Sequence, residues 1–253
     1  MTDTDVHELA GRRALVTGAA SGIGAAIAEV FVARGAQVML CDIDEGVAKV
    51  AADLGAESVI CDVTSESDVA AAVAATVQAF GGIEILVNNA GIEGNWAKLA
   101  DATGDDVDSI FAVNVKGVLF GIKHAAPAMP RGGSIINIAS LAAIRAAPLL
   151  GVYGAAKAAA VSLTQTASLE LRSAGIRVNA VLPSYTSTPR GDKALAVLDT
   201  PGQSHELAIK KSQGRMAQAG EVAEVVAFLG SERASFVSGQ VVSVDNAAST
   251  RFV

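Results

Sequence analysis

The sequence has few of the residues on which disulfide frameworks and metal sites depend. Among its 253 residues are 2 cysteines and 3 histidines, and the histidines lie far apart. A disulfide scaffold needs more cysteines, and a zinc site needs ligands at short spacings. Cys41 and Cys61 each precede an aspartate at the end of a predicted strand, so we expect two neighbouring, buried, reduced thiols. A disulfide between them is the alternative, and we predict no metal site.

Basic clusters and long apolar segments are also missing. The formal net charge is −7, and no group of basic residues offers a surface to nucleic acid or an anionic membrane. The alanine-rich stretches are interrupted by Gln, Glu or Lys before they reach the length of a membrane span. The first eight residues lack the apolar segment of a signal peptide. We therefore expect a cytoplasmic protein that binds neither nucleic acid nor membrane.

Aromatic residues make up only 4% of the chain, although 51% of it is hydrophobic and alanine is abundant. This composition suits helices packed closely on a parallel sheet better than a β-sandwich. A chain of this length can bury a sizeable core. No linker, repeat or low-complexity tract divides the sequence, so we expect a single domain over residues 1–253.

Apolar runs alternate with amphipathic segments along the chain. Strands are predicted at 14–17, 38–41, 58–61, 85–87, 135–138, 177–182 and 241–244, and helices at 67–80, 105–125, 153–171 and 221–229. Continuous apolar strands separated by helices are typical of a parallel sheet that is covered on both faces. We predict the α/β class, with a Rossmann-type doubly wound parallel sheet of seven strands flanked by helices on both faces. The switch point between the first and fourth strands would then place a ligand at the carboxyl ends of the strands.

A glycine-rich turn follows the first predicted strand. It contains Gly18, Ser21, Gly22, Ile23 and Gly24, and a segment with helical spacing comes next. Strand, turn and helix in this order are the context that a dinucleotide fingerprint needs. The first glycine permits the tight turn, the next lets the backbone approach a pyrophosphate, and the last allows close packing of the helix. The motif predicts a bound dinucleotide.

Asp42 ends the second predicted strand. A carboxylate at this place accepts hydrogen bonds from the adenosine ribose and repels a 2′-phosphate. Residues 41–45 contain no Lys or Arg that could bind such a phosphate. We therefore predict NAD(H) rather than NADP(H) as the cofactor. The alternative is that Asp42 caps the next helix, for which Asp44 is the better candidate.

Tyr153 and Lys157 are four residues apart in a predicted helix, and such residues share one face. A phenol titrates near pH 10 in water, and a nearby lysine cation favours the phenolate and lowers its pKa. The pair is therefore a candidate acid/base centre. A packed tyrosine beside a solvated lysine would also explain the spacing when it is taken alone.

Together these residues resemble the short-chain dehydrogenase/reductase family, in the branch with Thr-Gly-x3-Gly-x-Gly and Tyr-x3-Lys motifs. The match runs from Arg13 to about Asp245, and its motifs occur in the family's order. The resemblance implies a catalytic tetrad of Asn114, Ser140, Tyr153 and Lys157. It implies further cofactor-binding residues at Asp62, Val63, Asn89, Ala90, Gly91, Pro183, Thr186 and Thr188, with Tyr153 and Lys157 also contacting the cofactor. It also places the seventh strand beside the sixth.

The resemblance implies reversible hydride transfer between NAD(H) and a secondary alcohol/ketone pair, with oxidation as the expected direction. Tyr153 would exchange the hydroxyl proton, while Lys157 would stabilise the phenolate and hold the ribose next to the nicotinamide. Ser140 would hydrogen-bond the substrate oxygen, and Asn114 would keep a water beside Lys157. The alternatives are a simple strand-end hydroxyl at Ser140 and a buried Asn114 that bonds neighbouring backbone.

Residues 141–150 are expected to border the substrate pocket, joined by Trp96 from the loop after the fourth strand. Their mainly apolar side chains favour a hydrophobic cyclic or steroid-like substrate over a sugar. Arg145 either recognises a carboxylate or is an exposed surface residue. The polar segment 187–213 is predicted as an active-site lid, with a disordered surface loop as the alternative.

Some features leave choices open. Ser184 replaces a usual glycine, and Asp245-Asn246-Ala247 stands where Asp-Gly-Gly is common in the family.

Two other functions are compatible with the sequence: a non-catalytic NAD-binding redox sensor, and an NADP-dependent 3-oxoacyl reductase. The intact tetrad disfavours the sensor, while Asp42 and the lack of a basic entrance for a carrier protein disfavour the reductase. The resemblance also implies a homotetramer in which segments 105–125 and 153–171 pack between subunits.

Overall fold

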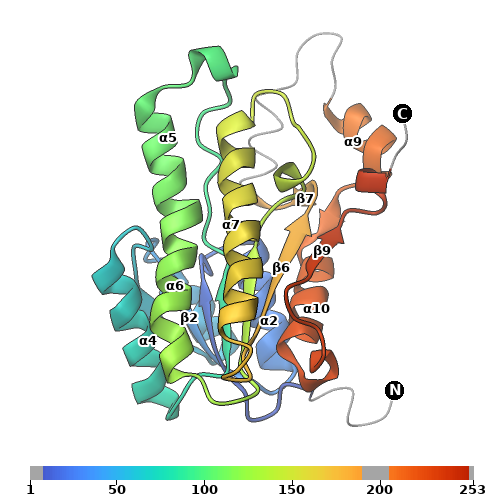
Figure 1. Cartoon of the computed structure of the whole chain (residues 1–253). Coiled ribbons are helices and arrows are strands. Elements are labelled where there is room, and N and C mark those ends of the chain that lie inside the picture. Colours follow the sequence, from blue (N-terminus) through green and yellow to red (C-terminus); the bar gives the residue numbers. More distant parts are fainter. Residues whose placement is uncertain (1–7, 190–204, 251–253) are drawn as a thin grey trace.

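A parallel β-sheet forms the middle layer of the computed structural model, which describes residues 8–189 and 205–250 (Figure 1). Its strands are β1 (Arg13–Thr17), β2 (Gln37–Asp42), β3 (Glu57–Ile60), β4 (Ile85–Asn88), β5 (Ser134–Ile138), β6 (Arg177–Pro183) and β9 (Val241–Val244). They are ordered β3-β2-β1-β4-β5-β6-β9, and neighbouring strands run parallel. The predicted seven-stranded, Rossmann-type sheet is confirmed, with the first and fourth strands adjacent and the seventh, β9, beside the sixth.

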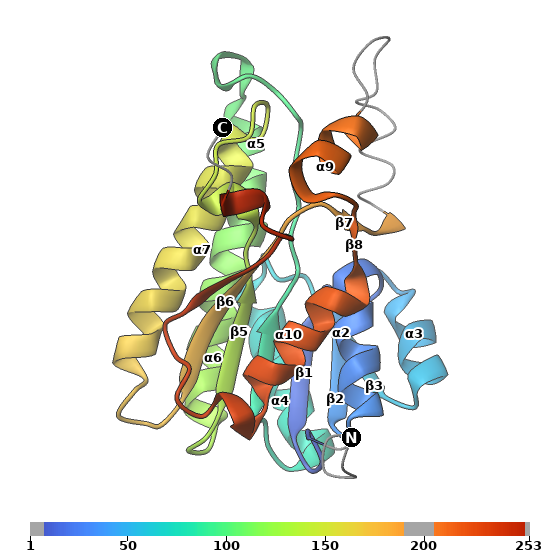
Figure 2. The ribbon, with the colours of Figure 1, turned by 90° about the vertical axis from the view of Figure 1, so that its right-hand side faces the viewer.

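Helices cover both faces of the sheet (Figure 2). One face carries α2 (Gly22–Ala33), α3 (Val47–Leu54) and α10 (Ala219–Gly230), and the other carries α4 (Glu66–Phe80), α5 (Gly104–Phe111), α6 (Gly117–Ala125) and α7 (Gly151–Glu170). Successive strand residues point to opposite faces. In β1, Val16 therefore belongs to the core under Phe31 of α2, whereas Leu15 belongs to the core under Val73 of α4.

The burial of the strands explains their composition. Every residue of β5 and β6 is buried, because these strands lie inside the sheet and between two helical layers. The edge strand β3 is only partly buried. The carboxyl ends of all these strands lie at one edge of the sheet, and the polar residues that end them gather there.

The segment predicted as one helix over 105–125 contains a π-helical turn. Residues Ala112–Lys116 form this turn between α5 and α6, and Asn114 is buried within it. π-helical turns inside α-helices are frequent at functional sites. The predicted extent of the helix was right, but its regularity was not, because hydrophobic spacing does not reveal one extra residue in a turn.

Two described stretches after β6, residues 184–189 and 205–218, contain regular elements that the polar sequence did not indicate. β7 (Thr186–Ser187) pairs with β8 (Ala217–Gln218), and α9 (His205–Gln213) precedes β8. Gln213 is buried, and its amide donates to the carbonyl oxygens of Tyr185 (2.8 Å) and Arg215 (2.7 Å). Part of the predicted lid, residues 190–204, lies outside the described residues, so the lid stays a prediction.

Short 3₁₀ helices complete the described secondary structure. They are η1 (Leu99–Asp101), η3 (Ala126–Ala128), η4 (Leu141–Ala143), η5 (Glu232–Ala234) and η6 (Ala248–Thr250). None of the helices in the described ranges combines the length and the hydrophobicity that crossing a membrane requires.

The two cysteines lie at the carboxyl ends of β2 and β3. Cys41 and Cys61 are buried free thiols, and a hydrogen bond with Cys61 together with burial raises the pKa of Cys41. The amide of Cys61 donates to the carbonyl of Asp42 (2.9 Å), which fixes the two strand ends side by side. The prediction of neighbouring, buried thiols is confirmed.

Candidate active site

The glycine-rich turn has a backbone that only glycine fits. Gly18 and Gly22 have φ angles of 67° and 61°, which side chains other than glycine rarely adopt. A Cβ atom on Gly18 would lie 2.7 Å from the Cα of Ala90, and one on Gly24 would lie 2.1 Å from the carbonyl oxygen of Gly18. The predicted tight turn and close approach of the helix are therefore confirmed.

Hydrogen bonds tie this turn to the end of β4. The hydroxyl of Thr17 accepts from the amides of Asn89 (3.0 Å) and Ala90 (3.1 Å). The side-chain amide of Asn89 donates to the carbonyls of Thr17 (2.9 Å) and Gly18 (3.0 Å). Asn89 thus holds the turn in shape. Thr17 is the threonine of the Thr-Gly-x3-Gly-x-Gly motif, but its hydrogen bonds to the residues after β4 were not predicted from the sequence.

Two half-buried carboxylates lie at the carboxyl ends of β2 and β3. Asp42 accepts from the amide of Ala20 (2.9 Å) in the glycine turn and from the amide of Asp44 (3.0 Å). Asp62 accepts from the amide (2.9 Å) and the hydroxyl (2.8 Å) of Thr64. Asp44 accepts from the amide of Gly46 (2.8 Å), the N-cap residue of α3, so it closes the turn before this helix, whereas neither Asp42 nor Asp44 is the N-cap itself.

These features fit a dinucleotide. The first turn of α2 presents backbone amides beside a glycine cradle that a Cβ would fill, which suits a pyrophosphate. Asp42 and Asp62 are hydrogen-bond acceptors at the adjacent strand ends. In this arrangement the predicted residues Gly18, Ser21, Gly22, Gly24, Asp42, Asp62, Val63 and Ala90 lie along the ends of β1, β2, β3 and β4.

A pocket of about 370 Å³ lies next to the glycine turn, at the carboxyl ends of the strands. It is lined by the predicted residues Ile23, Asn89, Gly91, Ser140, Tyr153, Lys157, Pro183, Thr186 and Thr188. A Cβ on Gly22 would lie 3.4 Å from Thr188, so the segment after β6 lies next to the glycine turn. The fold therefore brings these residues together, as predicted.

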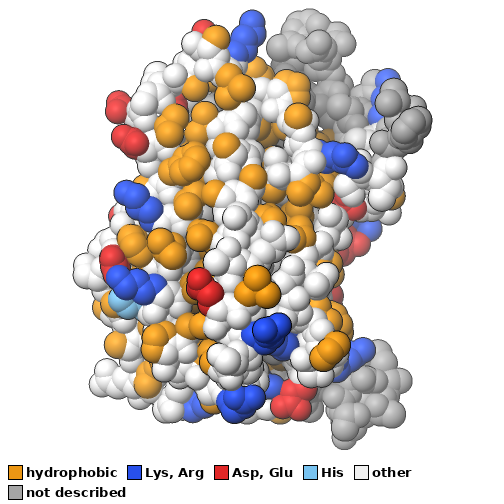
Figure 3. All heavy atoms as spheres, viewed as in Figure 1, with side chains coloured by type: hydrophobic (Ala, Val, Ile, Leu, Met, Phe, Trp, Pro, Cys, Tyr) orange, Lys and Arg blue, Asp and Glu red, His pale blue; other side chains and the backbone are white. Residues whose placement is uncertain are grey.

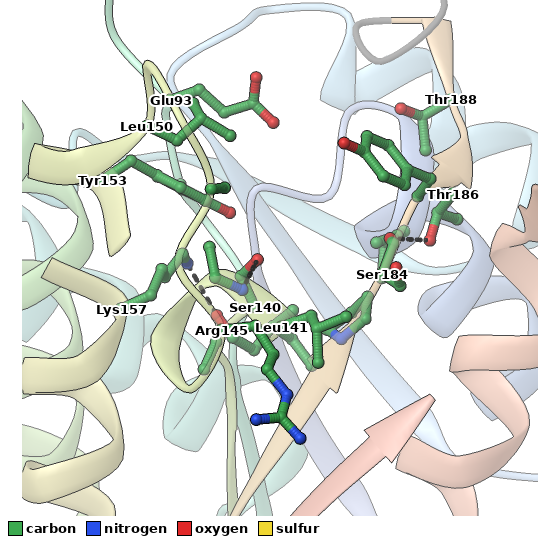
Figure 4. Close-up of a pocket in the computed structure, with 18 of the residues that line it drawn as sticks. Glu93, Ser140, Leu141, Arg145, Leu150, Tyr153, Lys157, Ser184, Thr186 and Thr188 are labelled. Carbon is green, nitrogen blue, oxygen red and sulfur yellow. Dashed lines mark hydrogen bonds between the residues drawn. The ribbon is translucent and has the colours of Figure 1, made fainter. Parts of the chain in front are cut away.

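Tyr153, Ser140 and Lys157 point toward one another in this pocket (Figure 4). The hydroxyl of Ser140 accepts from the amide of Ala142 (3.2 Å) at the start of η4. The ammonium of Lys157 donates to the carbonyl of Ile138 (2.8 Å) and lies 5.8 Å from the centre of the Tyr153 ring. Lys157 is only 3% exposed, which holds its charge inside the protein.

Asn114 lies beside this group, although its side chain is bonded to backbone. Its amide nitrogen donates to the carbonyls of Ile92 (2.7 Å) and Ile110 (3.1 Å), and its oxygen accepts from the amide of Ile92 (3.2 Å). A Cβ on Gly91 would lie 2.8 Å from that oxygen and 3.1 Å from the ammonium of Lys157. Asn114 therefore fixes the loop after β4 next to Lys157.

Burial shifts the pKa values of both Tyr153 and Lys157. Burial raises the pKa of Tyr153 to about 12, a hydrogen bond from Ser140 opposes this rise, and the charge of Glu93 adds to it. Burial lowers the pKa of Lys157 to about 8, against the charge of Glu93. Burial is the largest influence on the pKa of Tyr153, and the lowering of this pKa by Lys157 stays a prediction.

Six residues of the segment 141–150 line this pocket, and their role in binding a substrate stays a prediction. Leu141, Ala142, Arg145, Ala146, Ala147 and Leu150 line the pocket, and so does Trp96. Arg145 is exposed, and its guanidinium donates to the carbonyl of Ser249 (3.0 Å from Nε). Glu93 was missed, although it is an acid placed two residues after Gly91 in an otherwise apolar part of the pocket.

The departures from the family pattern have different consequences. Ser184 donates its amide to the carbonyl of Val244 (3.2 Å) and does not have a left-handed φ, so the usual glycine is not required there. Asn246 and Ala247 have φ angles of 44° and 66°, the conformation that glycine prefers. The carboxylate of Asp245 accepts from the amide of Ala247 (3.2 Å) and so supports this strained turn.

A family model and several known proteins match most of this chain. Residues 18–247 match a family model described as enoyl-(acyl carrier protein) reductase. The chain is 39% identical over 255 residues to borneol dehydrogenase, mitochondrial, of Lavandula x intermedia, covering 98% of this chain and 95% of the relative. It is 37% identical over 246 residues to 3-oxoacyl-[acyl-carrier-protein] reductase FabG of Thermotoga maritima, covering 94% and 97%.

A solved structure shares the whole architecture. The crystal structure of levodione reductase superposes with a TM-score of 0.90 at 34% identity and covers 96% of this chain and 99% of that one. The similarity therefore extends through the substrate side of the molecule as well as the glycine turn.

Proposed function

Because the chain belongs to the short-chain dehydrogenase/reductase family, we propose that it transfers a hydride reversibly between NAD(H) and a secondary alcohol/ketone pair. The observation that carries this proposal is the convergence of Tyr153, Ser140 and Lys157 on one pocket beside the glycine turn (Figure 4). The catalytic and cofactor-binding roles below are proposals for these residues.

NAD(H) is the proposed cofactor, and its nicotinamide ring accepts or donates the hydride when it is bound. Asp42 would bind the adenosine ribose, Asp62 and Val63 the adenine, and the first turn of α2 the pyrophosphate. A 2′-phosphate would meet the carboxylate of Asp42, and the first lysine after β2, Lys49, pairs with Asp53 (2.5 Å). Comparing the affinities for NADH and NADPH tests this choice, and tighter binding of NADPH would contradict it.

Tyr153 is proposed as the acid/base. With a pKa of about 12, its phenol is protonated at neutral pH and can donate its proton to a ketone oxygen during reduction. Oxidation requires the phenolate, so it needs the opposite step, in which Tyr153 takes the proton of the substrate hydroxyl. A positive charge on Lys157 favours that phenolate, and Lys157 would also hold the ribose next to the nicotinamide.

Ser140 and Asn114 would support this proton transfer. The amide of Ala142 binds the oxygen of Ser140, which leaves the hydroxyl proton available for Tyr153 or for the substrate oxygen. Asn114 keeps the loop after β4 in place by three hydrogen bonds to Ile92 and Ile110. The water that Asn114 was expected to hold beside Lys157 stays a prediction.

A hydrophobic cyclic alcohol or ketone is the proposed substrate. Leu141, Ala142, Ala146, Ala147 and Leu150 give the pocket an apolar wall. The name of the borneol dehydrogenase refers to a bicyclic alcohol, which agrees with this class. A panel of cyclic and linear alcohols, followed by the absorbance of reduced nicotinamide, tests it.

A 3-oxoacyl reductase is the second candidate, because one relative and the family model are described by acyl-carrier-protein chemistry. An acidic carrier protein would need basic residues at the entrance. Arg145 is the exposed cation of the pocket wall, and it is bonded to Ser249. Faster NADPH-dependent reduction of acetoacetyl thioesters than of cyclic ketones would favour this candidate.

The third candidate function is a non-catalytic redox sensor. Any sustained turnover of an alcohol or ketone would exclude it.

The Tyr153→Phe variant tests the proposed mechanism. It keeps the ring and removes the proton, so turnover should fall roughly a thousandfold while NADH binding persists. Turnover equal to that of the wild-type protein would refute the role of Tyr153.

The assembly state is also proposed from the family. A homotetramer is supported by exposed apolar residues on the face formed by α5, α6 and α7, where Leu119 is 44% and Leu169 is 67% exposed. Figure 3 shows hydrophobic side chains spread over this face. Light scattering during size-exclusion chromatography gives the subunit count, and a monomer would contradict the proposal. A cytoplasmic location stays a prediction.

A further inference from the structure

Glu93 places a carboxylate in a pocket wall that is otherwise mainly apolar. It lies in the loop after β4, lines the same pocket as Tyr153 and is half-buried. Figure 4 shows its carboxylate extending into the pocket on the side of Tyr153 that faces away from Lys157. The proposed roles of Ser140, Tyr153 and Lys157 leave this charge unused.

The loop holds Glu93 in a defined position. The indole nitrogen of Trp96 donates to Oε2 of Glu93 (3.0 Å). On the other side, Ile92 is fixed by both atoms of the Asn114 amide. Gly94 has a φ of 69°, and a Cβ there would lie 2.5 Å from Ile110, so the chain turns sharply directly after Glu93. A residue fixed on both sides in this way is preorganised for a ligand.

The charge of Glu93 acts on Lys157 across the pocket, but the two do not form a direct ion pair. Within residues 8–189 and 205–250, Glu93 takes part in no ion pair. The other charged residues of the pocket wall are bonded to backbone, Lys157 to the carbonyl of Ile138 and Arg145 to that of Ser249. The guanidinium of Arg145 also points away from Tyr153 in Figure 4.

A carboxylate has two oxygens, and the indole of Trp96 occupies one of them. The second oxygen can accept a hydrogen bond from a molecule in the pocket. A half-buried anion also attracts a cation and repels another anion more strongly than a fully solvated one does.

We propose that Glu93 is a specificity-determining residue that binds a second hydrogen-bond donor of the substrate, a hydroxyl or an ammonium group, and excludes substrates with a carboxylate at that place. This inference rests on the proposed function and narrows its substrate class. The substrate is then a hydrophobic ring that carries one oxidisable hydroxyl and a separate donor, rather than a plain hydrocarbon alcohol.

Three compounds with the same ring test this inference. Cyclohexane-1,4-diol carries a neutral donor, 4-aminocyclohexanol a cation and 4-hydroxycyclohexanecarboxylate an anion. For the wild-type protein at neutral pH, kcat/KM should be higher for the diol and the amine than for the carboxylate. Glu93→Gln keeps the shape and removes the charge, so the ratio of amine to carboxylate should fall roughly tenfold or more.

Glu57→Gln is the matched control. It removes the same charge from an exposed position at the start of β3, at the opposite end of the strands from the pocket. This variant should keep the wild-type ratio. A wild-type preference for the carboxylate, or an unchanged ratio in Glu93→Gln, would overturn the inference.

Binding measurements separate this inference from the proposed function. If the wild-type protein oxidises none of the three compounds with NAD or NADP, the proposed substrate class is wrong. The role of Glu93 in binding can still be tested by calorimetric titration of the same compounds into the protein with NADH. A ratio of amine to carboxylate affinity that falls in Glu93→Gln supports its role, and an equal ratio in both proteins refutes it.

Discussion

The glycine turn and the substrate wall lie at the same edge of the sheet, but they are built differently. The turn is backbone held by regular elements: β1 leads into it, α2 leaves it, and Asn89 bonds two of its carbonyls. The substrate wall is made of side chains from the loop after β4, residues 141–150 and the segment after β6. The first region is specified by short sequence spacing, whereas the second depends on how distant segments meet.

Strain is distributed differently as well. In the glycine turn, glycines occupy the positions with positive φ. Leu149 in segment 141–150, and Asn246 and Ala247 in the segment after β9, adopt positive φ without being glycine. Arg145 joins two of these segments through Ser249. These segments therefore contain backbone strain that the glycine turn avoids. Such strain is found most often at sites that bind ligands.

Breaking the glycine turn should have the largest effect. In Gly24→Ala the new methyl would lie 2.1 Å from the carbonyl oxygen of Gly18, and backbone cannot yield as a flexible side chain can. We expect a loss of about 3 kcal/mol of unfolding free energy and no measurable NADH binding. Chemical denaturation and NADH fluorescence titration measure both.

Gly220→Ala in α10 is the control for that variant, because a Cβ there meets no atom within 4 Å. It should leave NADH binding unchanged and stabilise the helix by about 0.5 kcal/mol. If Gly24→Ala bound NADH as Gly220→Ala does, the close packing of helix on turn would not matter for the cofactor.

A methyl group between the two regions should have an intermediate effect. In Gly91→Ala it would lie 2.8 Å from the oxygen of Asn114 and 3.1 Å from the ammonium of Lys157. Displacing Lys157 should lower kcat about a hundredfold while the adenosine end of the cofactor site keeps its affinity for ADP-ribose. Steady-state kinetics give kcat, and calorimetry gives the affinity for ADP-ribose. An equal loss of kcat and of ADP-ribose affinity would place the damage in the glycine turn instead.

Relieving strain in the turn after β9 should have the smallest effect. Ala247 has a φ of 66°, so Ala247→Gly should raise the unfolding free energy by about 1 kcal/mol. Ala102→Gly, at a φ of −66°, should lower it by a similar amount. Thermal unfolding compares the two, and destabilisation by both would show that the turn at Ala247 is not strained.

The parts of the molecule that could be predicted from the sequence are those with local signals. The apolar runs gave each strand of the seven-stranded sheet to within one residue at either end, but not the short strands β7 and β8, and the glycine spacing gave a turn that Gly18 and Gly24 indeed require. The spacing of Tyr153 and Lys157 placed both on one face of α7, next to Ser140 from the end of β5.

The features that could not be predicted depend on tertiary contacts. The π-helical turn around Asn114 adds a residue without changing the hydrophobic pattern. Glu93 becomes notable only when the fold puts it beside Tyr153. The raised pKa of Tyr153 follows from burial, and sequence spacing does not give the degree of burial. Helix α9 lies in a polar segment, and the buried Gln213 at its end bonds Tyr185.

The pH dependence of both directions tests the acid/base role of Tyr153 most directly. Because burial raises its pKa to about 12, the phenolate is scarce at neutral pH and becomes more abundant as the pH rises. We predict that kcat/KM for alcohol oxidation rises between about pH 6 and 10 and that kcat/KM for ketone reduction does not, while Tyr153→Phe loses this difference. An oxidation rate that is independent of pH, or a Tyr153→Phe variant with the wild-type profile, would contradict the account.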